Sequence, residues 1–251
     1  MPVRGVLFDM GGTLLHYSAP GANWEDTEKI GASGVYALLQ EAGYDLPPQE
    51  QALAQAWHHA REIWAAIVAQ GRQVRNFRIE QQIEQMVARW NVPDLPPPLI
   101  QRAAHAYMSA IQAHVRPLDG AAETLAALRE QGLRVGLISN THWPGRYHVA
   151  DLERFALLPH LEHLVFSADV SAWKPGEQIF ALGLEALGLT PDEAVYVGDT
   201  LYFDVWGAQG AGLRAVWIEQ PHRWLPDGLE VTPDATVRTL PELPQLVRRW
   251  M

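Results

Sequence analysis

The chain has 251 residues, of which 48% are hydrophobic and 19% are charged, and its formal net charge at pH 7 is −10. This length suits one sizeable domain, or a core domain that carries a smaller inserted one. The negative charge argues against nucleic acid or an anionic membrane as the main partner, while the composition leaves the oligomeric state open. Because cysteine is absent, disulfides, thiolate catalysis and Cys-ligated metals are excluded.

The N-terminal sequence MPVRGVLF runs almost at once into a strand-like segment. It lacks the long apolar stretch of a secretory signal, and no run elsewhere is apolar and long enough to span a bilayer. We therefore expect a cytoplasmic protein.

Apolar runs typical of buried strands occur in the first and last parts of the chain, at Val6–Phe8, Val135–Ile138, His163–Phe166, Ala194–Val197 and Ala215–Ile218. Helical patterns at Ala121–Gln131 and Gln178–Leu187 lie between the later runs, and each is followed by a glycine, a common helix stop. Strands that alternate with helices predict an α/β fold with a Rossmann-like, doubly wound parallel sheet. We assign residues 1–16 and 117–251 to this core domain.

Residues 17–116 show helical periodicity and almost no strand signal. A first helix is expected near Thr27–Ala42, and apolar residues then recur at helical spacing in three stretches: Leu53, Trp57, Ala60, Trp64 and Ile67; Ile79, Ile83, Met86 and Trp90; Leu99, Ala103, Ala106 and Ala110. This pattern predicts an inserted four-helix domain in which the tryptophans belong to the core. His58 and His59 are adjacent on one helix and cannot face the same way, so they make a poor metal-binding pair.

Polar residues follow the predicted strands, at the edge of a parallel sheet where ligands bind. They are Asp9; Ser139 and Asn140; Lys174; and Asp199 and Asp204. Lys174 is notable because only two of the 19 basic residues are lysines. Taken singly, these residues also have structural explanations as helix caps, turn residues or solvated carboxylates. Their convergence at one edge favours a functional site.

Four short strings carry a family resemblance: FDMGGT, ISN, KP and GDTLYFD, in this order. They resemble the four motifs of the haloacid dehalogenase (HAD) superfamily, and the helical insert lies where the C1 cap of that family lies. The resemblance extends over nearly the whole chain. It implies a core domain with a cap at residues 17–116, and a Mg²⁺-dependent, phosphatase-like hydrolase that acts on a small phosphorylated metabolite.

The resemblance also implies roles for individual residues. Asp9 would be the nucleophile that forms an aspartyl-phosphate, which divides one difficult hydrolysis into two easier transfers. Mg²⁺, a hard cation that prefers oxygen ligands, would be held by Asp9, the Gly11 carbonyl, Asp199 and Asp204. The phosphoryl oxygens would be bound by the residues that offer hydroxyl, amide, ammonium or backbone N–H groups: Ser139, Asn140, Lys174, Met10 and Gly11.

One expected carboxylate is missing. Phosphatases of this superfamily usually carry a second Asp two residues after the nucleophile, where this chain has Gly11. A positioned general acid typically supplies a factor of about 10²–10⁴ in rate. Another side chain could replace it, and we select His142 ahead of His16 and Tyr17. Alternatively the substrate has a good leaving group, such as an acyl or aryl phosphate, or the protein binds phosphate without turning it over.

A dehalogenase is the first enzymatic alternative, because the L-2-haloacid dehalogenases of the superfamily also lack the second Asp. They need no metal and do not keep the paired acids of the fourth motif. Placing Asp199 and Asp204 beside Asp9 without a cation would bring like charges together at a cost, which favours phosphoryl chemistry. The non-enzymatic alternative is a phosphate-sensing or scaffold protein.

Overall fold

The computed structural model describes residues 1–74, 77–92, 94–221 and 223–251. The chain forms two compact units. The first contains Met1–His16, Gly71–Asn76 and Arg116–Met251, and the second contains Tyr17–Gln70 and Phe77–Val115. The expected insert, residues 17–116, therefore differs from the second unit at the segment that begins with Gly71 and at Arg116. Among the described residues, no helix combines the length and the apolar character needed to cross a membrane.

The first unit is built on a parallel sheet of six strands in the order β5-β4-β1-β6-β7-β8. Their bounds are β1 Gly5–Phe8, β4 Arg134–Ser139, β5 His163–Phe166, β6 Ala194–Gly198, β7 Arg214–Ile218 and β8 Ala235–Val237. All five expected strands are present, and β8 adds a short edge strand that the sequence analysis did not identify. The expected α/β fold with a Rossmann-like sheet is confirmed.

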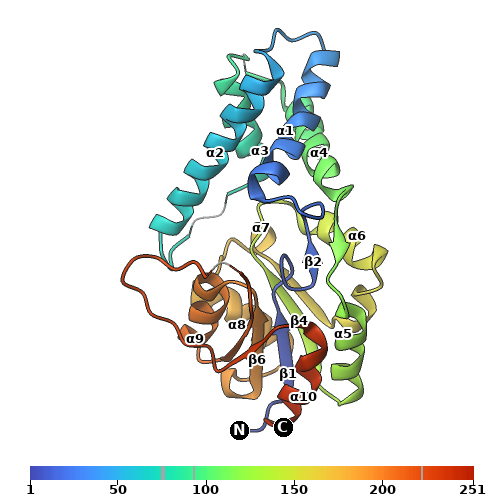
Figure 1. The fold of residues 1–251 in the computed structure, drawn as a ribbon, viewed down its shortest axis with the longest axis vertical. Coiled ribbons are helices and arrows are strands. Elements are labelled where there is room, and N and C mark those ends of the chain that lie inside the picture. The colour runs from blue at the N-terminus through green and yellow to red at the C-terminus, as the bar shows by residue number, and fades with distance from the viewer. Residues whose placement is uncertain (75–76, 93, 222) are drawn as a thin grey trace. The chain divides into compact units, whose positions relative to one another are not determined.

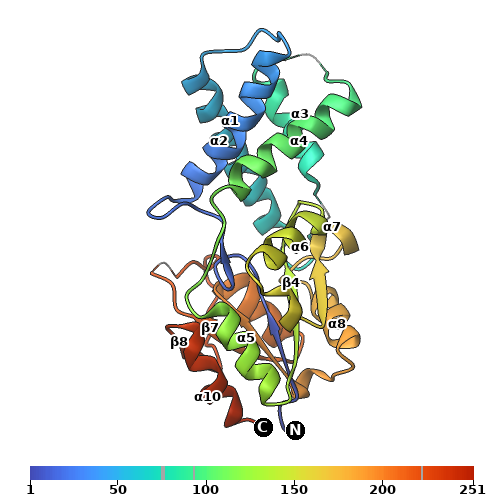
Figure 2. The same cartoon turned by 90° about the vertical axis from the view of Figure 1, so that its right-hand side faces the viewer.

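Helices cover both faces of this sheet. Figures 1 and 2 show α8 and α9 on one side and α5 and α10 on the other. The helical bounds are α5 Ala121–Glu130, α6 Gly145–Arg154, α7 Ser167–Val170, α8 Glu177–Ala186, α9 Gly207–Gly210 and α10 Leu243–Arg248, with a π-helical turn at Leu201–Trp206. Because both faces are covered, the central strands are almost entirely apolar and buried.

The strand register decides which residues meet at the carboxyl edge of the sheet. Phe8, the last residue of β1, lies opposite Leu137 of β4 and Val197 of β6. Asp9 is the next residue after β1, and its N–H donates to the Val197 carbonyl at 2.8 Å. Residues just beyond Leu137 and Val197 therefore flank Asp9 on both sides. The strand order also reverses at β1, where ligands bind in open α/β sheets.

Two short strands, β2 (Leu15–His16) and β3 (Arg116–Pro117), pair antiparallel where the chain leaves and re-enters the first unit. The second unit contains four helices: α1 Trp24–Glu41, α2 Gln49–Ala69, α3 Ile79–Arg89 and α4 Pro97–Gln112. A reciprocal capping box between Asn23 and Asp26 starts α1. Helices α1 and α4 approach closely at Gly34, which has no side chain. A Cβ added there would lie only 2.6 Å from the Ala106 carbonyl oxygen.

The expected core face of α2 is partly wrong. The buried residues of this helix are Ala52, Ala56, His59, Ala60 and Ile67. Trp64 is 37% exposed, and its ring packs with the Trp24 ring at the surface, 5.7 Å between centroids. Small side chains line the buried face because α2 receives Trp90, whose indole N–H donates to the Ala52 carbonyl at 3.0 Å. A large indole from the residue that caps the C-terminus of α3 thus replaces the expected indoles from α2.

His58 is exposed and His59 is buried, so the two rings do not face the same way, as expected. A similar rotation occurs on α4, where Ala106 and Ala110 are only half-buried. Tyr107 and Met108 fill the buried face of α4 in their place. The stripe on α3 is correct, since Ile79, Ile83, Met86 and Trp90 are all buried.

Arg72, in the segment that joins α2 to α3 in sequence, packs within the first unit. Its guanidinium carbon lies 4.0 Å from the centre of the Trp206 ring, and Nη1 donates to the Glu177 carboxylate at 3.2 Å. Trp206 ends the π-helical turn and Glu177 begins α8. A Cβ added at Gly210 would lie 2.1 Å from Nη2 of Arg72, so the guanidinium occupies the space beside that glycine.

We predict that Arg72→Ala lowers the free energy of unfolding by about 1 kcal/mol, because a cation–π contact of this kind contributes ~0.5–2 kcal/mol. Gly210→Ala should destabilise the wild-type protein, since the new methyl group collides with the guanidinium. In the Arg72→Ala background the same change should be stabilising, because alanine favours helix over glycine. Urea unfolding of the four proteins measures the coupling. Equal effects of Gly210→Ala in both backgrounds would contradict this packing.

Candidate active site

The turn after β1 presents Asp9 and depends on a glycine at position 12. The N–H groups of Leu14 and Leu15 both donate to the Met10 carbonyl, at 2.8 and 2.9 Å. Gly12 adopts a φ of +81°, which is unfavourable for other residues. A Cβ at this position would also lie 2.2 Å from Oδ2 of Asp199. Gly12 therefore allows both the turn and the close approach of the Asp199 carboxylate.

A second glycine makes room for Asp204. Gly198 is the last residue of β6, and a Cβ added there would lie 2.4 Å from the Cβ of Asp204. Asp204 is 1% exposed and lies in the π-helical turn. Its Oδ2 accepts hydrogen bonds from the Thr200 N–H at 2.9 Å and from the Thr200 hydroxyl at 2.5 Å. The local chain thus holds one oxygen of Asp204 and directs the other towards the site.

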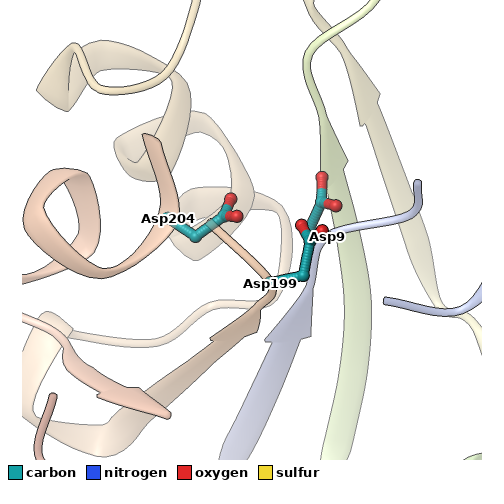
Figure 3. Close-up of side chains that lie close together, drawn as sticks. All are labelled: Asp9, Asp199 and Asp204. Atoms are coloured by element: carbon teal, nitrogen blue, oxygen red, sulfur yellow. The ribbon is translucent and has the colours of Figure 1, made fainter. Parts of the chain in front are cut away.

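The carboxylates of Asp9, Asp199 and Asp204 form one cluster. One oxygen from each lies within 4.8 Å of the others. Figure 3 shows that they come from the end of β1, the end of β6 and the turn that follows β6. Oxygen ligands gathered in this way suit a hard divalent cation such as Mg²⁺.

Lys174 is buried among the acids, with 2% of its surface exposed. Its Nζ donates to Oδ1 of Asp9 at 2.6 Å and to Oδ1 of Asp204 at 2.7 Å. The third donated bond goes to the Tyr196 hydroxyl at 2.9 Å. One ammonium group thus bridges two of the three carboxylates and uses all of its protons.

Charge at the site is not balanced by the protein alone. Burial raises the pKa of Asp9 to about 6, against the attraction of Lys174 and with a further contribution from Asp204. Burial, followed by the charges of Asp9 and Asp204, raises the pKa of Asp199 well above its ordinary value. Burial disfavours the charge on Lys174, but Asp204 and Asp9 together raise its pKa. Three carboxylates facing one ammonium leave an excess of negative charge that a divalent cation would neutralise.

Ser139 is placed as the sequence predicted. It ends β4 one step beyond the level of Asp9, and Asp199, the residue directly after β6, lies at the same level on the other side of Asp9. Ser139 is 2% exposed, and among the described residues none forms a hydrogen bond with its hydroxyl. This hydroxyl is available to a ligand at the edge of the sheet.

Asn140 has a different role from the expected one. Its side-chain Nδ2 donates to the Lys174 carbonyl at 2.9 Å, and its Oδ1 accepts from the Lys174 N–H at 2.8 Å. Both ends of the amide are used to hold the backbone of Lys174. The expectation that the Asn140 side chain binds phosphate is therefore replaced by a positioning role.

The turn offers fewer N–H groups than a complete anion nest would. The N–H of Gly12 donates to the Leu15 carbonyl at 2.8 Å, so it is not available to a phosphoryl group. The Met10 N–H interacts with the Asp9 carboxylate and lowers the pKa of that group. By the same reasoning as for Gly12, the N–H of Gly11 is the remaining candidate for a backbone contact to phosphate, and the expected contact from Met10 would have to compete with Asp9.

His142 follows β4 in the loop before α6, and burial lowers its pKa to about 4. Its ring is therefore uncharged near pH 7 and is a weak proton source. The loop is fixed by a network that the sequence analysis missed. The Thr141 hydroxyl hydrogen-bonds to Nε2 of His148 at 2.7 Å, and the Ser167 hydroxyl donates to the Thr141 carbonyl at 2.7 Å.

Two further supporting residues were not identified from the sequence. Tyr196, in the apolar run AVYVG of β6, contacts Lys174. The indole N–H of Trp217 on β7 donates to the Asp199 carbonyl at 2.8 Å. A polar group in an otherwise apolar strand is the only sequence signal for either residue.

Comparison with known proteins places this site in a family. The family described as haloacid dehalogenase-like hydrolase matches residues 3–212. A pyrimidine 5'-nucleotidase of Escherichia coli is 35% identical over 57% of this chain and 61% of its own length. A phosphoserine phosphatase of Thermus thermophilus is 37% identical over 51% of this chain and 50% of its own length. A glyceraldehyde 3-phosphate phosphatase of Methanopyrus kandleri is 28% identical, over 87% of this chain and 84% of its own length.

The chain spans 47–61% of the lengths of the first four curated relatives that it matches. Solved structures share the fold over nearly the whole chain. A 2-haloacid dehalogenase of Pseudomonas syringae has a TM-score of 0.71 at 21% identity, covering 99% of this chain and 100% of that one. The magnesium-bound HAD-hydrolase YfnB of Bacillus subtilis has a TM-score of 0.67 at 19% identity, covering 98 and 99%. With the family match extending over residues 3–212, the chain belongs to the haloacid dehalogenase-like hydrolases.

Proposed function

We propose that the protein is a Mg²⁺-dependent phosphatase that hydrolyses a small phosphorylated metabolite through an aspartyl-phosphate on Asp9. The observation that carries this proposal is the cluster of Asp9, Asp199 and Asp204 around the single ammonium of Lys174. The phosphatase names of several relatives support the same reaction class. Their printed substrates differ, so they support a class of substrate, a small phosphorylated metabolite.

Asp9 is the proposed nucleophile. Lys174 binds only Oδ1 of Asp9, which leaves Oδ2 to attack phosphorus. In the first step the Oδ2–P bond forms while the bond between phosphorus and the leaving-group oxygen breaks. In the second step a water oxygen attacks the same phosphorus, which releases phosphate and restores Asp9. Both steps require Asp9 to begin or end as a carboxylate.

The residues present fit a divalent cation. Asp9, Asp199 and Asp204, with the Gly11 carbonyl, would hold Mg²⁺, which would neutralise charge on the phosphoryl oxygens. Ser139, through its hydroxyl, and Gly11, through its N–H, would bind phosphoryl oxygens, and the charge of the Lys174 ammonium would attract them. The cap proposed at residues 17–116 would select the substrate.

The leaving group receives little help from charged acids in this arrangement. Gly11 supplies no carboxyl group, and the burial that lowers the pKa of His142 to about 4 keeps its ring neutral near pH 7. His142 stays a candidate only as a neutral hydrogen-bond donor. The site therefore favours acyl or aryl phosphates, whose leaving groups depart without strong protonation.

We expect p-nitrophenyl phosphate and acetyl phosphate to be hydrolysed with Mg²⁺ and not with EDTA, and a sugar phosphate to be a poor substrate. Asp9→Asn should lower turnover of both good substrates by a factor of about 10³ or more, because the nucleophile is lost. Release of phosphate and of p-nitrophenol measures this. Halide release from 2-chloropropionate without metal would identify a dehalogenase instead. Tm shifts with phosphate but no turnover would indicate a binding protein.

The stability of the metal-free protein should depend on pH through Asp9. Because the pKa of Asp9 is raised to about 6, the folded metal-free protein takes up a proton at a higher pH than the unfolded chain does. Ionised Asp9 therefore lowers the stability of the fold above this pKa. This loss of stability disappears as the pH falls from about 6 towards the ordinary pKa of an aspartate. Asp9→Asn should raise the Tm of the metal-free protein at about pH 7.5 and have a smaller effect at about pH 5.

Thermal unfolding of both proteins at the two pH values, with EDTA and with Mg²⁺, tests this prediction. Mg²⁺ should stabilise the wild-type protein more strongly at the higher pH, because a proton competes with the metal for Asp9. An Asp9→Asn effect that is the same at both pH values would show that the titration of Asp9 is not involved.

A third prediction concerns the missing acid. Gly11→Asp should raise kcat for the sugar phosphate, by up to about 10²-fold, and change kcat for p-nitrophenyl phosphate much less, because only the poor leaving group needs a proton. Gly11→Asn is the matched control, with the same size and no acid. If Gly11→Asn gives the same gain, or if His142→Gln abolishes wild-type turnover of the sugar phosphate, an acid other than residue 11 serves the leaving group.

A further inference from the structure

Tyr196 brings a single polar group to the buried side of the catalytic lysine. It lies in the middle of β6, three residues before Asp199, and its side chain is fully buried. Its ring packs edge-on against Phe180 of α8, with 5.0 Å between the ring centres. This packing fixes the orientation of the ring, and the hydroxyl at its edge reaches Lys174.

The hydrogen bonds of this hydroxyl have a defined direction. The Tyr196 hydroxyl lies 3.0 Å from the Ile138 carbonyl oxygen, which can only accept. The single phenolic proton is therefore given to Ile138, and an oxygen lone pair remains for Lys174, whose Nζ donates at 2.9 Å. The accepting carbonyl belongs to Ile138 of β4, and the residue after Ile138 in this strand is Ser139. Tyr196 thus ties the position of Lys174 to the strand that carries another proposed phosphate ligand.

Lys174 is consequently held at both ends. Asn140 binds both polar groups of its backbone, and Tyr196 binds its Nζ on the side away from solvent. Asp9 and Asp204 accept the other two protons. Both carboxylates are proposed to bind other groups during turnover, whereas Tyr196 has no second role. Its hydroxyl is the one partner of the ammonium that stays constant while the charges around it change.

We propose that Tyr196 is a positioning residue for Lys174, whose hydroxyl fixes the ammonium group for contact with Asp9 and the phosphoryl group. This inference rests on the phosphoryl-transfer function proposed above. Burial, with the nearby carboxylates, raises the pKa of Tyr196 well above its ordinary value, so the phenol stays neutral. A neutral acceptor orients the ammonium without pairing with its charge, which remains available to Asp9 and to the substrate.

The small number of lysines allows a direct test. Lys29 and Lys174 are the only lysines in the chain, so protein labelled with ¹⁵N at lysine Nζ gives two side-chain signals, which Lys29→Arg assigns. In wild-type protein the Lys174 ammonium should exchange with solvent more slowly than that of Lys29. Tyr196→Phe should shift the Lys174 signal and accelerate its exchange by about tenfold, because one hydrogen bond to a buried charge is lost. The Lys29 signal should not change.

Kinetics supply the second readout, with Tyr202→Phe as the control. Tyr202 is also buried and lies near the site in the π-helical turn. We expect Tyr196→Phe to lower kcat for p-nitrophenyl phosphate about tenfold with little change in KM, because Lys174 contributes most when charge develops in the transition state. Tyr202→Phe should leave kcat close to the wild-type value. A loss of similar size in both variants would indicate a general packing effect and overturn the proposal.

The NMR and kinetic results separate this inference from the proposed function. An unchanged Lys174 signal in Tyr196→Phe would overturn the positioning role, whatever the activity. An altered Lys174 signal, in a protein whose wild type hydrolyses no phosphate ester, would support the positioning role and reject the phosphatase. If Tyr196→Phe does not fold, the wild-type protein still decides. The Lys174 ammonium protons should then show a nuclear Overhauser contact to the Tyr196 ring, and its absence would reject the geometry.

Discussion

The structure of the site depends on placing three carboxylates and one ammonium group in a space that is nearly closed to water. Asp9, Asp204 and Lys174 are all buried, and each of the two bonds that join them is shorter than 2.8 Å. One ammonium group cannot balance three ionised acids: Lys174 attracts Asp199, but burial and the charges of Asp9 and Asp204 outweigh this attraction and raise the pKa of Asp199. The protein therefore retains a local excess of negative charge, which is the condition that makes a site both costly to fold and able to bind a divalent cation.

The backbone around the cluster is shaped by this constraint. At Gly12 and Gly198 the space that a side chain would occupy is filled by the carboxylates of Asp199 and Asp204. Trp217 anchors the Asp199 carbonyl from the next strand. These supports come from β1, β6 and β7, which are neighbours in the sheet. The acids are thus held by rigid strands and tight turns, so their mutual repulsion does not simply push them apart.

The sequence predicted the parts of the fold that depend on local patterns. Buried strands and their order relative to helices follow from apolar runs, and the acids at Asp9 and Asp199 follow from strand ends that must share one edge. Lys174 was found in the same way and by the rarity of lysine in this chain, and the motif resemblance gave it a role. The predicted buried face of α2 was wrong because helical periodicity does not show which neighbouring element supplies the large side chains. Here Trp90, the residue after α3, supplies one. The edge strand β8 has only three residues, too few for a periodic signal.

The sequence also could not predict which residues of the site form hydrogen bonds with one another, for a physical reason. An Asn beside a Ser at a strand end fits a phosphate ligand as well as it fits a backbone clamp, and only the three-dimensional path of the chain shows that Asn140 meets Lys174. Tyr196 looks like a β-forming core residue, since tyrosine is common in strands. Arg72 lies between two helices of the insert in sequence, yet its ring partner, Trp206, is more than a hundred residues away.

The absence of an acid at Gly11 acquires a meaning from the same balance of charge. A fourth carboxyl group in this space would have to stay protonated, or would add to the repulsion that already raises the pKa of Asp9 and Asp199. In a site with only one lysine, a glycine at position 11 keeps the charge within what one ammonium and one divalent cation can neutralise. Under the proposed mechanism the consequence is chemical: the site would keep its proposed nucleophile and cation ligands and would have no carboxylic acid at position 11 to protonate the leaving group. Selectivity for substrates would then arise in part from the leaving group's own acidity.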